Sequence, residues 1–270
     1  VEVAAGVTAV KAGDRVMAES VVWCGECAPC RRGRTHLCLE RKLFGIHRPG
    51  GMAEYVAVPA QLLHRLPDSV PLNHAAVVEP TVVAVHGVLL QPPKPGDVVL
   101  VTGPGPVGLL AGQVACAAGA EVFVAGAPAD AATRLPIAQA LGLHTLDPSL
   151  PVAEALRQAS GGQADLVLEC SGSGQALAGA LDAVRPGGAI TFLGLFAAPI
   201  EVNLSAAIRK ELSLRPSYIG TWQDFDRAIR LLAEGAIKVE PLLVPYALRD
   251  ALAGFDDAMQ RRVMKPLLLP

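Results

Sequence analysis

The 270-residue sequence lacks the features that would point to a nucleic acid or a membrane. It carries no excess of charge: the formal net charge is −2 at pH 7, so electrostatics favour neither nucleic acid nor an anionic membrane as a partner. It contains no run of about eighteen uninterrupted apolar residues, which predicts no membrane span. Residues 1–6 lack the basic start and apolar core of a signal peptide. We therefore expect a cytoplasmic protein.

Length and composition allow sizeable hydrophobic cores. A chain of 270 residues makes one large or two ordinary domains, and 51% of the residues are hydrophobic against 18% charged. Three parts differ in pattern. Residues 1–86 carry short valine runs punctuated by glycine and proline, residues 87–216 alternate apolar runs with alanine- and leucine-rich stretches, and residues 217–270 hold two expected helices and a closing strand. The alternation in the middle part predicts βαβ units, with helices on both faces of a parallel sheet.

Local patterns predict individual elements. In the first part, a turn at Gly13 leads into a strand, and the alternation over Ala53–Pro59 favours another strand. In the last part, helices are expected near residues 222–234 and 249–261, before a strand at Pro266–Leu269. Strands of the middle part are expected at Val98–Val101, Val122–Val124, Leu166–Leu168 and Ile190–Leu193.

Four of the six cysteines crowd into one short segment, at Cys24, Cys27, Cys30 and Cys38. Four thiolates at this spacing can surround one tetrahedral Zn²⁺ and close all its coordination positions, which indicates a structural metal rather than a catalytic one. Two disulfides would need an oxidising compartment. An iron–sulfur cluster accepts thiolates at related spacings. We favour structural zinc over both alternatives.

A glycine-rich turn with the G-x-G-x-x-G pattern opens the middle part. It follows an expected strand and precedes an expected helix, the context in which this motif binds a dinucleotide. Gly103 permits the tight turn, Gly105 lets the backbone approach a pyrophosphate, and Gly108 lets helix and strand pack closely. Pro106 and Val107 complete the motif, and the anion is expected on the N–H groups of the helix start. The alternative is an ordinary glycine-rich turn.

The residues after the second expected strand leave the choice between NAD and NADP open. NAD enzymes usually place an acid there, on the ribose 2′-hydroxyl. Here that position holds Gly126, while Glu121 stands at the other end of the strand. Asp130 could fold back to the ribose, and Arg134 could meet a 2′-phosphate. Alternatively Asp130 caps the next helix and Arg134 is solvated.

The zinc segment and the dinucleotide motif occur in the order found in one family. Other matching segments are Gly6–Val7, Val10, Gly13–Val16, Gly50–Tyr55, Ala75–Pro80 and Arg185–Gly188. Together they cover essentially the whole chain. The sequence resembles the zinc-dependent medium-chain alcohol and polyol dehydrogenases, and among these the sorbitol- and threonine-dehydrogenase-like members.

The resemblance implies an α/β enzyme of two domains. A β-rich GroES-like catalytic domain is formed from both chain ends, with a doubly wound parallel (Rossmann) sheet inserted between them. It implies a catalytic zinc that polarises the hydroxyl of a secondary alcohol or polyol, and hydride transfer to NAD or NADP. Glu79 matches the Glu-Pro pair that, in polyol-type members, ligates this zinc directly or through water. A homodimer or homotetramer is implied as well.

The sequence departs from the family pattern at its beginning. The family's early cysteine and the histidine of its Gly-His-Glu motif, two ligands of the catalytic zinc, have no counterpart from Val1 onward. We expect an N-terminally truncated enzyme that holds the structural zinc but cannot by itself assemble a normal catalytic zinc site. The alternatives are a non-catalytic NAD(P)-binding module and a quinone-reductase-like activity, against which the zinc segment argues.

Further candidate site residues are proposed only from their place in the sequence. His47 is expected to line the substrate cleft or to be a solvated loop residue. Glu54 is expected to support the catalytic site or to be an exposed strand carboxylate. Cys116 and Cys170 lie among apolar neighbours and are expected to be buried, inert thiols. Additional cofactor-binding candidates follow strands at their carboxyl ends or border the expected nicotinamide position: Ser171, Gly172, Gly194, Tyr218 and Ile219.

Overall fold

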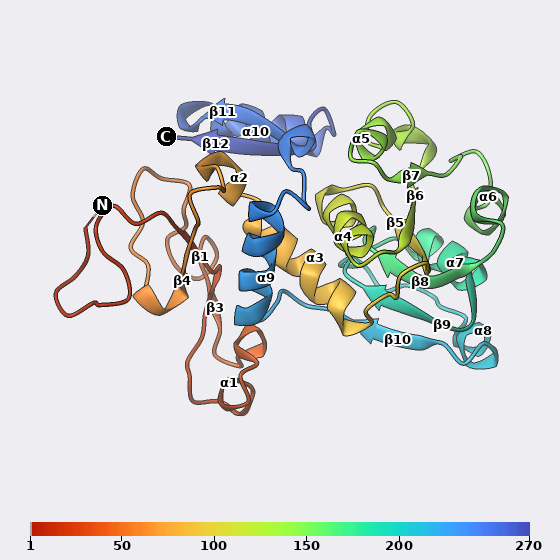
Figure 1. Ribbon diagram of the computed structural model, residues 1–270, viewed down its shortest axis with the longest axis horizontal. Coiled ribbons are helices and arrows are strands. Elements are labelled where there is room, and N and C mark those ends of the chain that lie inside the picture. Colours follow the sequence, from red (N-terminus) through yellow and green to blue (C-terminus); the bar gives the residue numbers. More distant parts are fainter. Residues whose placement is uncertain (1) are drawn as a thin grey trace. The chain divides into compact units, whose positions relative to one another are not determined.

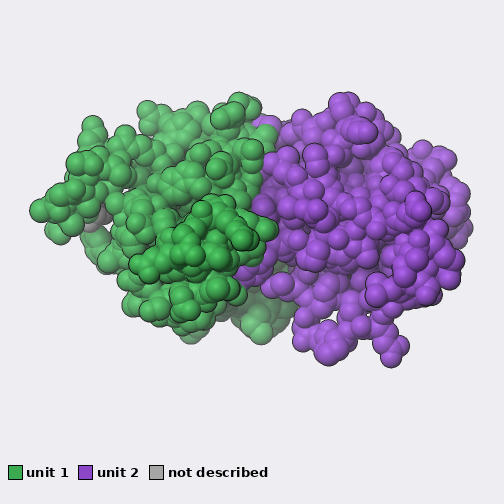
Figure 2. Space-filling model, turned by 90° about the horizontal axis from the view of Figure 1, so that it is seen from below, with its two compact units in different colours: residues 1–82, 220–235, 243–270 green, residues 83–219, 236–242 purple. Residues whose placement is uncertain are grey.

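The computed structural model describes residues 2–270, which form two compact units (Figure 2). Unit 1 holds the chain up to residue 82 together with residues 220–235 and 243–270, and unit 2 holds residues 83–219 and 236–242. The first boundary falls inside helix α3 (Val78–Leu90), as does the predicted one at residue 86. Among residues 2–270, no helix combines the length and apolar character needed to span a bilayer.

Unit 2 is built on one six-stranded parallel sheet with the strand order β10-β9-β8-β5-β6-β7. Its strands are β5 (Val98–Thr102), β6 (Glu121–Ala125), β7 (His144–Thr145), β8 (Ala164–Glu169), β9 (Val184–Phe192) and β10 (Ser213–Pro216). Its helices are α4 (Pro106–Ala117), α5 (Leu135–Ala140), α6 (Val152–Ser160), α7 (Gly174–Ala183) and α8 (Leu204–Arg209), with 3-10 turns η3 (Pro128–Asp130) and η4 (Glu240–Leu242). The strand order reverses between β5 and β8, which is the predicted doubly wound arrangement.

The central strands of this sheet are apolar on both faces because helices cover both. Val99, Leu100 and Val101 of β5 are all completely buried. Helix α4 packs on β5 and β6 on one side, and α6 and α7 lie on the other (Figure 1). On that second side Leu156 and Leu177 join Leu100 in one cluster of buried hydrophobic residues. A parallel sheet needs such cover on both faces, and removing this apolar area from water is its main source of stability.

The C-terminal end of α7 is capped by a lysine. The last carbonyl groups of a helix have no partner inside the helix. Lys210, just after α8, donates from Nζ to the carbonyl oxygens of Leu181 (2.7 Å), Asp182 (3.2 Å) and Val184 (2.8 Å). Its positive charge also opposes the negative end of the α7 dipole. One side chain thereby ties the end of α8 to the end of α7.

Unit 1 contains short strands in pairs rather than one large sheet. β1 (Val16–Ala18) pairs antiparallel with β4 (Leu63–Arg65), β2 (Val21–Val22) antiparallel with β3 (Lys42–Leu43), and β11 (Leu243–Ala247) parallel with β12 (Lys265–Leu269). The helices are α1 (Ala28–Arg31), α2 (Leu72–Ala75), α9 (Trp222–Ala233) and α10 (Ala251–Met259), with 3-10 turns η1 (Thr35–Leu37), η2 (Ala60–Leu62) and η5 (Leu248–Asp250). The strand after Gly13, both helices of the last part and the final strand confirm the prediction.

The strand predicted over Ala53–Pro59 is wrong. These residues have an irregular backbone, and residues 53–57 are exposed. A β-strand is stabilised by ladder hydrogen bonds to a neighbour and by burial of one face. Among residues 2–270 no strand pairs with this segment, so alternation alone does not make it extended.

His64 joins β4 to α9 within unit 1. Its ring is buried, and its centroid lies 3.7 Å from that of Trp222 and 4.6 Å from that of Phe225. Nε2 lies 3.1 Å from Oε1 of the buried Glu19, and Nδ1 lies 3.5 Å from Oδ1 of Asp226. Two rings and two carboxylates therefore connect segments that are far apart in the sequence.

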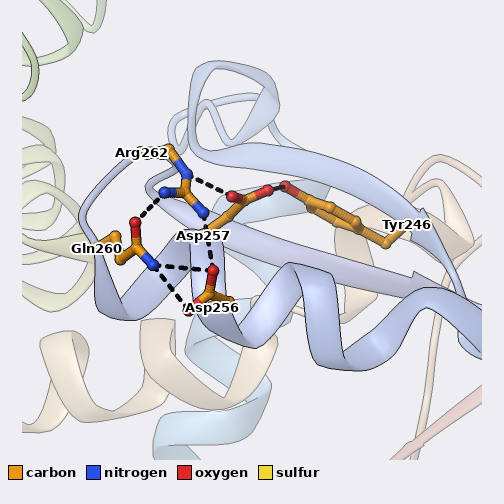
Figure 3. Close-up of polar contacts among 5 residues, drawn as sticks. All are labelled: Tyr246, Asp256, Asp257, Gln260 and Arg262. Carbon is orange, nitrogen blue, oxygen red and sulfur yellow. Dashed lines mark hydrogen bonds and ion pairs between the residues drawn. The ribbon is translucent and has the colours of Figure 1, made fainter.

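A polar network fixes the end of α10 to β11 (Figure 3). Tyr246 donates its phenolic hydrogen to Asp257 Oδ2 at 2.6 Å. Arg262 bonds Asp257 Oδ1 through Nε at 2.6 Å and Asp256 Oδ2 through Nη2 at 2.9 Å. Gln260 contacts both Asp256 and Arg262. The guanidinium thus bridges two adjacent carboxylates and closes the helix end.

Candidate functional site

The four cysteines of the predicted zinc segment come together at α1 and η1 of unit 1. The Sγ atoms of Cys24 and Cys38 are 3.6 Å apart, those of Cys27 and Cys38 3.9 Å, and those of Cys24 and Cys30 4.0 Å. All four sulfur atoms lie within 4.8 Å of one another. Thiolates around one tetrahedral Zn²⁺, at about 2.3 Å each, lie about 3.8 Å from one another. The donor set and its geometry therefore fit a single zinc ion, and the four thiols are free of disulfides.

The backbone around the cluster favours thiolates. The N–H of Cys24 points to Cys38 Sγ at 3.3 Å, and the N–H of Cys27 points to Cys24 Sγ at 3.4 Å. Backbone hydrogen bonds from Cys30 and Leu39 lower the pKa of the Cys27 thiol to about 6. Burial raises the pKa of Cys30 to about 12. A bound cation would compensate this burial, because metal ligation deprotonates a coordinating thiol.

The glycines of the dinucleotide motif have different surroundings. Gly103 has φ +99°, and a Cβ there would lie 2.9 Å from the backbone of Ser171. A Cβ at Gly108 would lie 2.0 Å from the carbonyl oxygen of Gly103, so helix and turn pack too closely for a side chain. A Cβ at Gly105 would meet nothing within 4 Å. Gly103 and Gly108 are thus required by the fold, whereas the fold leaves open space beside Gly105.

The start of α4 is suited to an anion. Gly105 is its N-cap residue and offers no side chain to cap the first N–H groups, and Pro106 and Val107 open the helix. These N–H groups have no partner inside the helix, and they carry the positive end of the helix dipole. The space beside Gly105 and the helix start together fit the pyrophosphate of a dinucleotide.

The predicted ribose residues form a cap at the end of β6. Oδ2 of the buried Asp130 accepts the N–H of Ala127 at 2.9 Å, and Oδ1 lies 3.9 Å from Nε of Arg134. A Cβ at Gly126 would lie 3.1 Å from the Asp130 side chain. Asp130 therefore caps the turn η3, of which it is the last residue, and not the next helix. Its role at the ribose stays a prediction, and no acid stands at Gly126 itself.

The loops after β8 and β9 meet the glycine turn. Ser171 and Gly172 follow β8, and Gly194 follows β9. A Cβ at Gly194 would lie 2.4 Å from the nitrogen of Gly172 and 2.7 Å from Oε2 of Glu169. Glu169 was not predicted. The signal for it was present, because an acid ends the otherwise apolar run of Leu166–Leu168.

Tyr218 and Ile219 lie in the segment that follows β10, and both are partly buried. Ile219 has φ +52°, a left-handed conformation that a β-branched residue rarely adopts. Such strain is found where surrounding structure holds a backbone in place, often at ligand sites. The role of both residues beside a nicotinamide stays a prediction.

The three predicted catalytic residues belong to unit 1. Glu79 lies in the first turn of α3 and is partly buried. Burial raises its pKa, which the charge of Lys265 and a hydrogen bond with Ser20 partly offset. His47 is exposed, and its Nδ1 accepts the N–H of Leu43 at 3.1 Å.

Glu54 is exposed in the irregular segment after the zinc lobe. Among residues 2–270, the four cysteines are the one group of three or more potential ligands close enough to hold a metal. The described residues around Glu79 therefore do not form a complete catalytic zinc site. Glu79 as a ligand of such a zinc stays a prediction.

The expectation for the two remaining thiols is wrong for Cys116, which is exposed on α4. Its neighbours Ala117 and Ala118 are exposed as well, so this face of the helix end points to solvent. Cys170 is partly buried, and burial with the nearby charge of Glu169 raises its pKa. Neither thiol lies with the zinc cluster.

Comparison with known proteins was made for the whole chain. The family model of zinc-binding dehydrogenases matches residues 106–234, and that of the alcohol dehydrogenase GroES-like domain matches residues 1–68. The chain is 35% identical over 276 residues to the sorbitol dehydrogenase of Halalkalibacterium halodurans, covering 100% of this chain and 80% of the relative. It is 35% identical over 261 residues to the L-threonine 3-dehydrogenase of Pyrococcus abyssi, covering 95% of this chain and 73% of the relative.

A solved structure with the same architecture carries a cofactor. A zinc-binding dehydrogenase from Sinorhizobium meliloti 1021, bound to NADP, superposes with a TM-score of 0.92 at 31% identity, covering 100% of this chain and 80% of that one. A doubly wound sheet with a dinucleotide turn and a four-cysteine zinc segment in one chain define a zinc-containing, NAD(P)-dependent oxidoreductase. The chain belongs to the zinc-dependent medium-chain dehydrogenases, with a Rossmann fold and a GroES-like domain. This confirms the predicted family, fold class, cofactors and enzyme class.

Proposed function

We propose that this chain binds NAD or NADP through unit 2 and serves hydride transfer between that cofactor and a secondary alcohol or polyol. The names of the relatives indicate hydroxyl-bearing substrates, sorbitol and L-threonine. NADP is the cofactor named for the similar solved structure. We propose the same classes of substrate and cofactor here.

The observation that carries the proposal is the open space beside Gly105. Among the described residues, nothing would touch a Cβ at this position, and its φ of −80° suits any residue. The fold itself therefore does not require glycine there. A ligand that must approach the backbone at the start of α4 does require it, and the pyrophosphate of a dinucleotide is such a ligand.

The residues of unit 2 have distinct tasks in this proposal. The N–H groups at Val107 and Gly108 bind the pyrophosphate. Gly126, Asp130 and Arg134 border the adenosine ribose, with Asp130 acting through the cap that it forms. Ser171, Gly172 and Gly194, with Tyr218 and Ile219, border the nicotinamide half. The bound dinucleotide supplies the hydride acceptor.

In this proposal unit 1 supplies the ligands of a structural zinc and one carboxylate ligand for a catalytic zinc. Cys24, Cys27, Cys30 and Cys38 hold a structural zinc that cross-links the lobe. Glu79 is the ligand that this chain offers to a catalytic zinc, since its carboxylate is partly buried in the first turn of α3. His47 and Glu54 are proposed to support the same site.

We further propose that the chain works as a homodimer or homotetramer in the reducing cytoplasm, where thiols persist. Leu195, Leu204 and Ile208 of unit 2 are 80%, 57% and 72% exposed. Of these, Leu204 lines an apolar pocket of about 390 Å³ between α7, α8 and β10. Large exposed apolar side chains of this kind mark interaction surfaces. Light scattering after gel filtration measures the assembly directly.

The test of the proposed function begins with cofactor binding. Purified chain is titrated into NADH and into NADPH, and the nicotinamide fluorescence is followed. Saturable binding of at least one is expected. Formation of reduced cofactor is then measured with sorbitol, L-threonine and other secondary alcohols, in the presence of zinc. A chain that binds neither NADH nor NADPH would refute the proposed function.

A further inference from the structure

A buried acid stands at the switch point of the unit 2 sheet. Glu169 is the last residue of β8 and is 0% exposed. In the sheet it is paired with Thr102, the last residue of β5, and with Phe192, the last residue of β9. A dinucleotide lies across the carboxyl ends of the strands where the strand order reverses. Glu169 is thus below the centre of the expected ligand.

The carboxylate is surrounded by donors from the loop that follows its own strand. Oε1 accepts the N–H of Ser171 at 2.9 Å and that of Gly172 at 3.1 Å, and it also accepts the Ser171 hydroxyl. The Thr102 hydroxyl lies 3.5 Å away, across the strand pair. Burying a carboxylate is unfavourable unless such bonds replace its water. The acid therefore dictates the backbone conformation at Ser171 and Gly172.

The turn formed in this way is locked between the two neighbouring loops. Gly172 has φ +64°, and a Cβ there would lie 2.3 Å from the carbonyl oxygen of Leu195. A Cβ at Gly103 would touch Ser171 at 2.9 Å, and one at Gly194 would touch Glu169 at 2.7 Å. The loops after β5, β8 and β9 meet around one carboxylate with no room for further side-chain atoms.

We propose that Glu169 is a positioning residue for the nicotinamide half of the dinucleotide. It does not touch the ligand but fixes Ser171 and Gly172, which do. In a doubly wound sheet each half binds one mononucleotide. The half with β5, β6 and β7 carries the glycine turn for the pyrophosphate and the adenosine side. The half with β8, β9 and β10 begins with the turn that Glu169 organises. This inference rests on the proposed dinucleotide binding.

The test compares two probes in the full chain. One is the reduced dinucleotide, NADH or NADPH, whichever binds the unaltered chain more tightly. The other is its adenosine half alone, 5′-AMP or adenosine 2′,5′-bisphosphate, measured by calorimetry. Glu169→Gln keeps the shape but turns an acceptor oxygen into an amide donor facing other donors. We expect the dissociation constant of the dinucleotide to rise about tenfold or more, and that of the adenosine probe to change by less than about twofold.

Asp165→Asn is the matched control on the same strand. Asp165 lies near the other end of β8, where its carboxylate accepts the N–H of Val98 at 2.8 Å and Nε of Arg185 at 2.6 Å. Its loss should lower the unfolding temperature while both dissociation constants stay within about twofold. A merely structural role of Glu169 would make Glu169→Gln behave in the same way.

Ser171→Ala is a second, milder variant in case Glu169→Gln does not fold. It removes one donor to the carboxylate and should weaken dinucleotide binding about threefold, with adenosine binding unchanged. Equal weakening of both probes by either variant, or dinucleotide binding within about twofold of the unaltered chain in both, would overturn the inference. If the unaltered chain binds no dinucleotide, the proposed function itself is refuted. That result differs from the two above, in which the unaltered chain binds the dinucleotide and only the inference about Glu169 fails.

Discussion

The side-chain amide of Gln113 satisfies both backbone groups of Lys238. Oε1 accepts the Lys238 N–H at 2.7 Å, and Nε2 donates to the Lys238 carbonyl at 3.1 Å. Gln113 is a buried residue of α4, and Lys238 lies in residues 236–242, which belong to unit 2 between two stretches of unit 1. A single side chain thus makes the contacts that a neighbouring strand would make.

Replacing this amide should loosen the segment. Gln113→Leu leaves a backbone N–H and a carbonyl without partners, and we expect it to lower the free energy of unfolding by about 2–3 kcal/mol. The measurement is urea unfolding followed by circular dichroism. Gln158→Leu is the control, because Gln158 is exposed on α6 and bonds only Glu154 among its described partners. Its effect should stay within about 0.5 kcal/mol, and equal effects of the two variants would contradict the role of Gln113.

A methyl group should affect different properties at Gly105 and Gly108: dinucleotide binding at Gly105 and stability at Gly108. Gly108→Ala forces a Cβ to 2.0 Å from the Gly103 carbonyl oxygen, so we expect a loss of at least about 2 kcal/mol in the free energy of unfolding. Gly105→Ala should leave stability within about 0.5 kcal/mol. It should nevertheless weaken dinucleotide binding at least about tenfold, because the methyl group fills the space of the pyrophosphate.

The measurements are thermal unfolding and the dinucleotide fluorescence titration. A Gly105→Ala variant that binds NADH and NADPH as tightly as the unaltered chain would remove the main support for the pyrophosphate site. A Gly108→Ala variant of full stability would show instead that the turn can move away from α4.

The cysteine lobe should account for one zinc ion per chain. Cys38→Ser removes a buried ligand, and we expect metal analysis after dialysis to show loss of that zinc. Cys116→Ser should retain it, because Cys116 is an exposed thiol outside the cluster. Acid should release the metal as well, since protons compete for thiolates. Full zinc content in Cys38→Ser would disprove the assignment of the site.

The network at the end of α10 should make stability depend on pH. The hydrogen bonds from Tyr246 and Arg262 lower the pKa of Asp257. A carboxyl with a lowered folded-state pKa contributes stability above its unfolded value of about 3.9, and this stability is lost as the pH falls through the folded value. Asp257→Asn should therefore unfold at a lower urea concentration than the unaltered chain at about pH 7, and the gap should narrow as the pH falls below the unfolded value of about 3.9.

Glu201→Gln serves as the control, because Glu201 is an exposed acid. Its urea midpoint should follow that of the unaltered chain at both pH values. A gap for Asp257→Asn that stayed constant with pH would mean that the ionised carboxylate adds nothing to the network.

The sequence predicts the parts of this structure that depend on neighbouring residues. The run Val98–Val101, the turn at Gly103 and the helix after it follow one another closely, so local pattern suffices. The segment Ala53–Pro59 fails for the opposite reason: a strand needs a partner, and pairing is not a local property. Cys116 fails because α4 is apolar on nearly every side, so periodicity does not tell which face is buried.

The residues of the candidate site also differ in whether the sequence alone predicts them. Spacing alone identifies Cys24, Cys27, Cys30 and Cys38, because the ligands of a zinc lobe lie close together in the chain. The sequence did not predict Glu169 as a site residue, because its role depends on three loops that meet only in the folded sheet. Asp130 shows a third case: its place after β6 suggested ribose binding or a cap on the next helix, and its carboxylate instead accepts the N–H that precedes its own turn η3.

The lysine that caps α7 has a practical consequence for following the folding of unit 2. All three N–H bonds of the Lys210 ammonium are directed at carbonyl oxygens, so acylation of this amine requires these hydrogen bonds to break. Amine-reactive reagents should therefore modify Lys210 of the native chain more slowly than its exposed lysines. The modified fraction of the peptide that contains Lys210, measured by mass spectrometry, would then report how much of the protein had opened around α7 and α8 during treatment with the reagent.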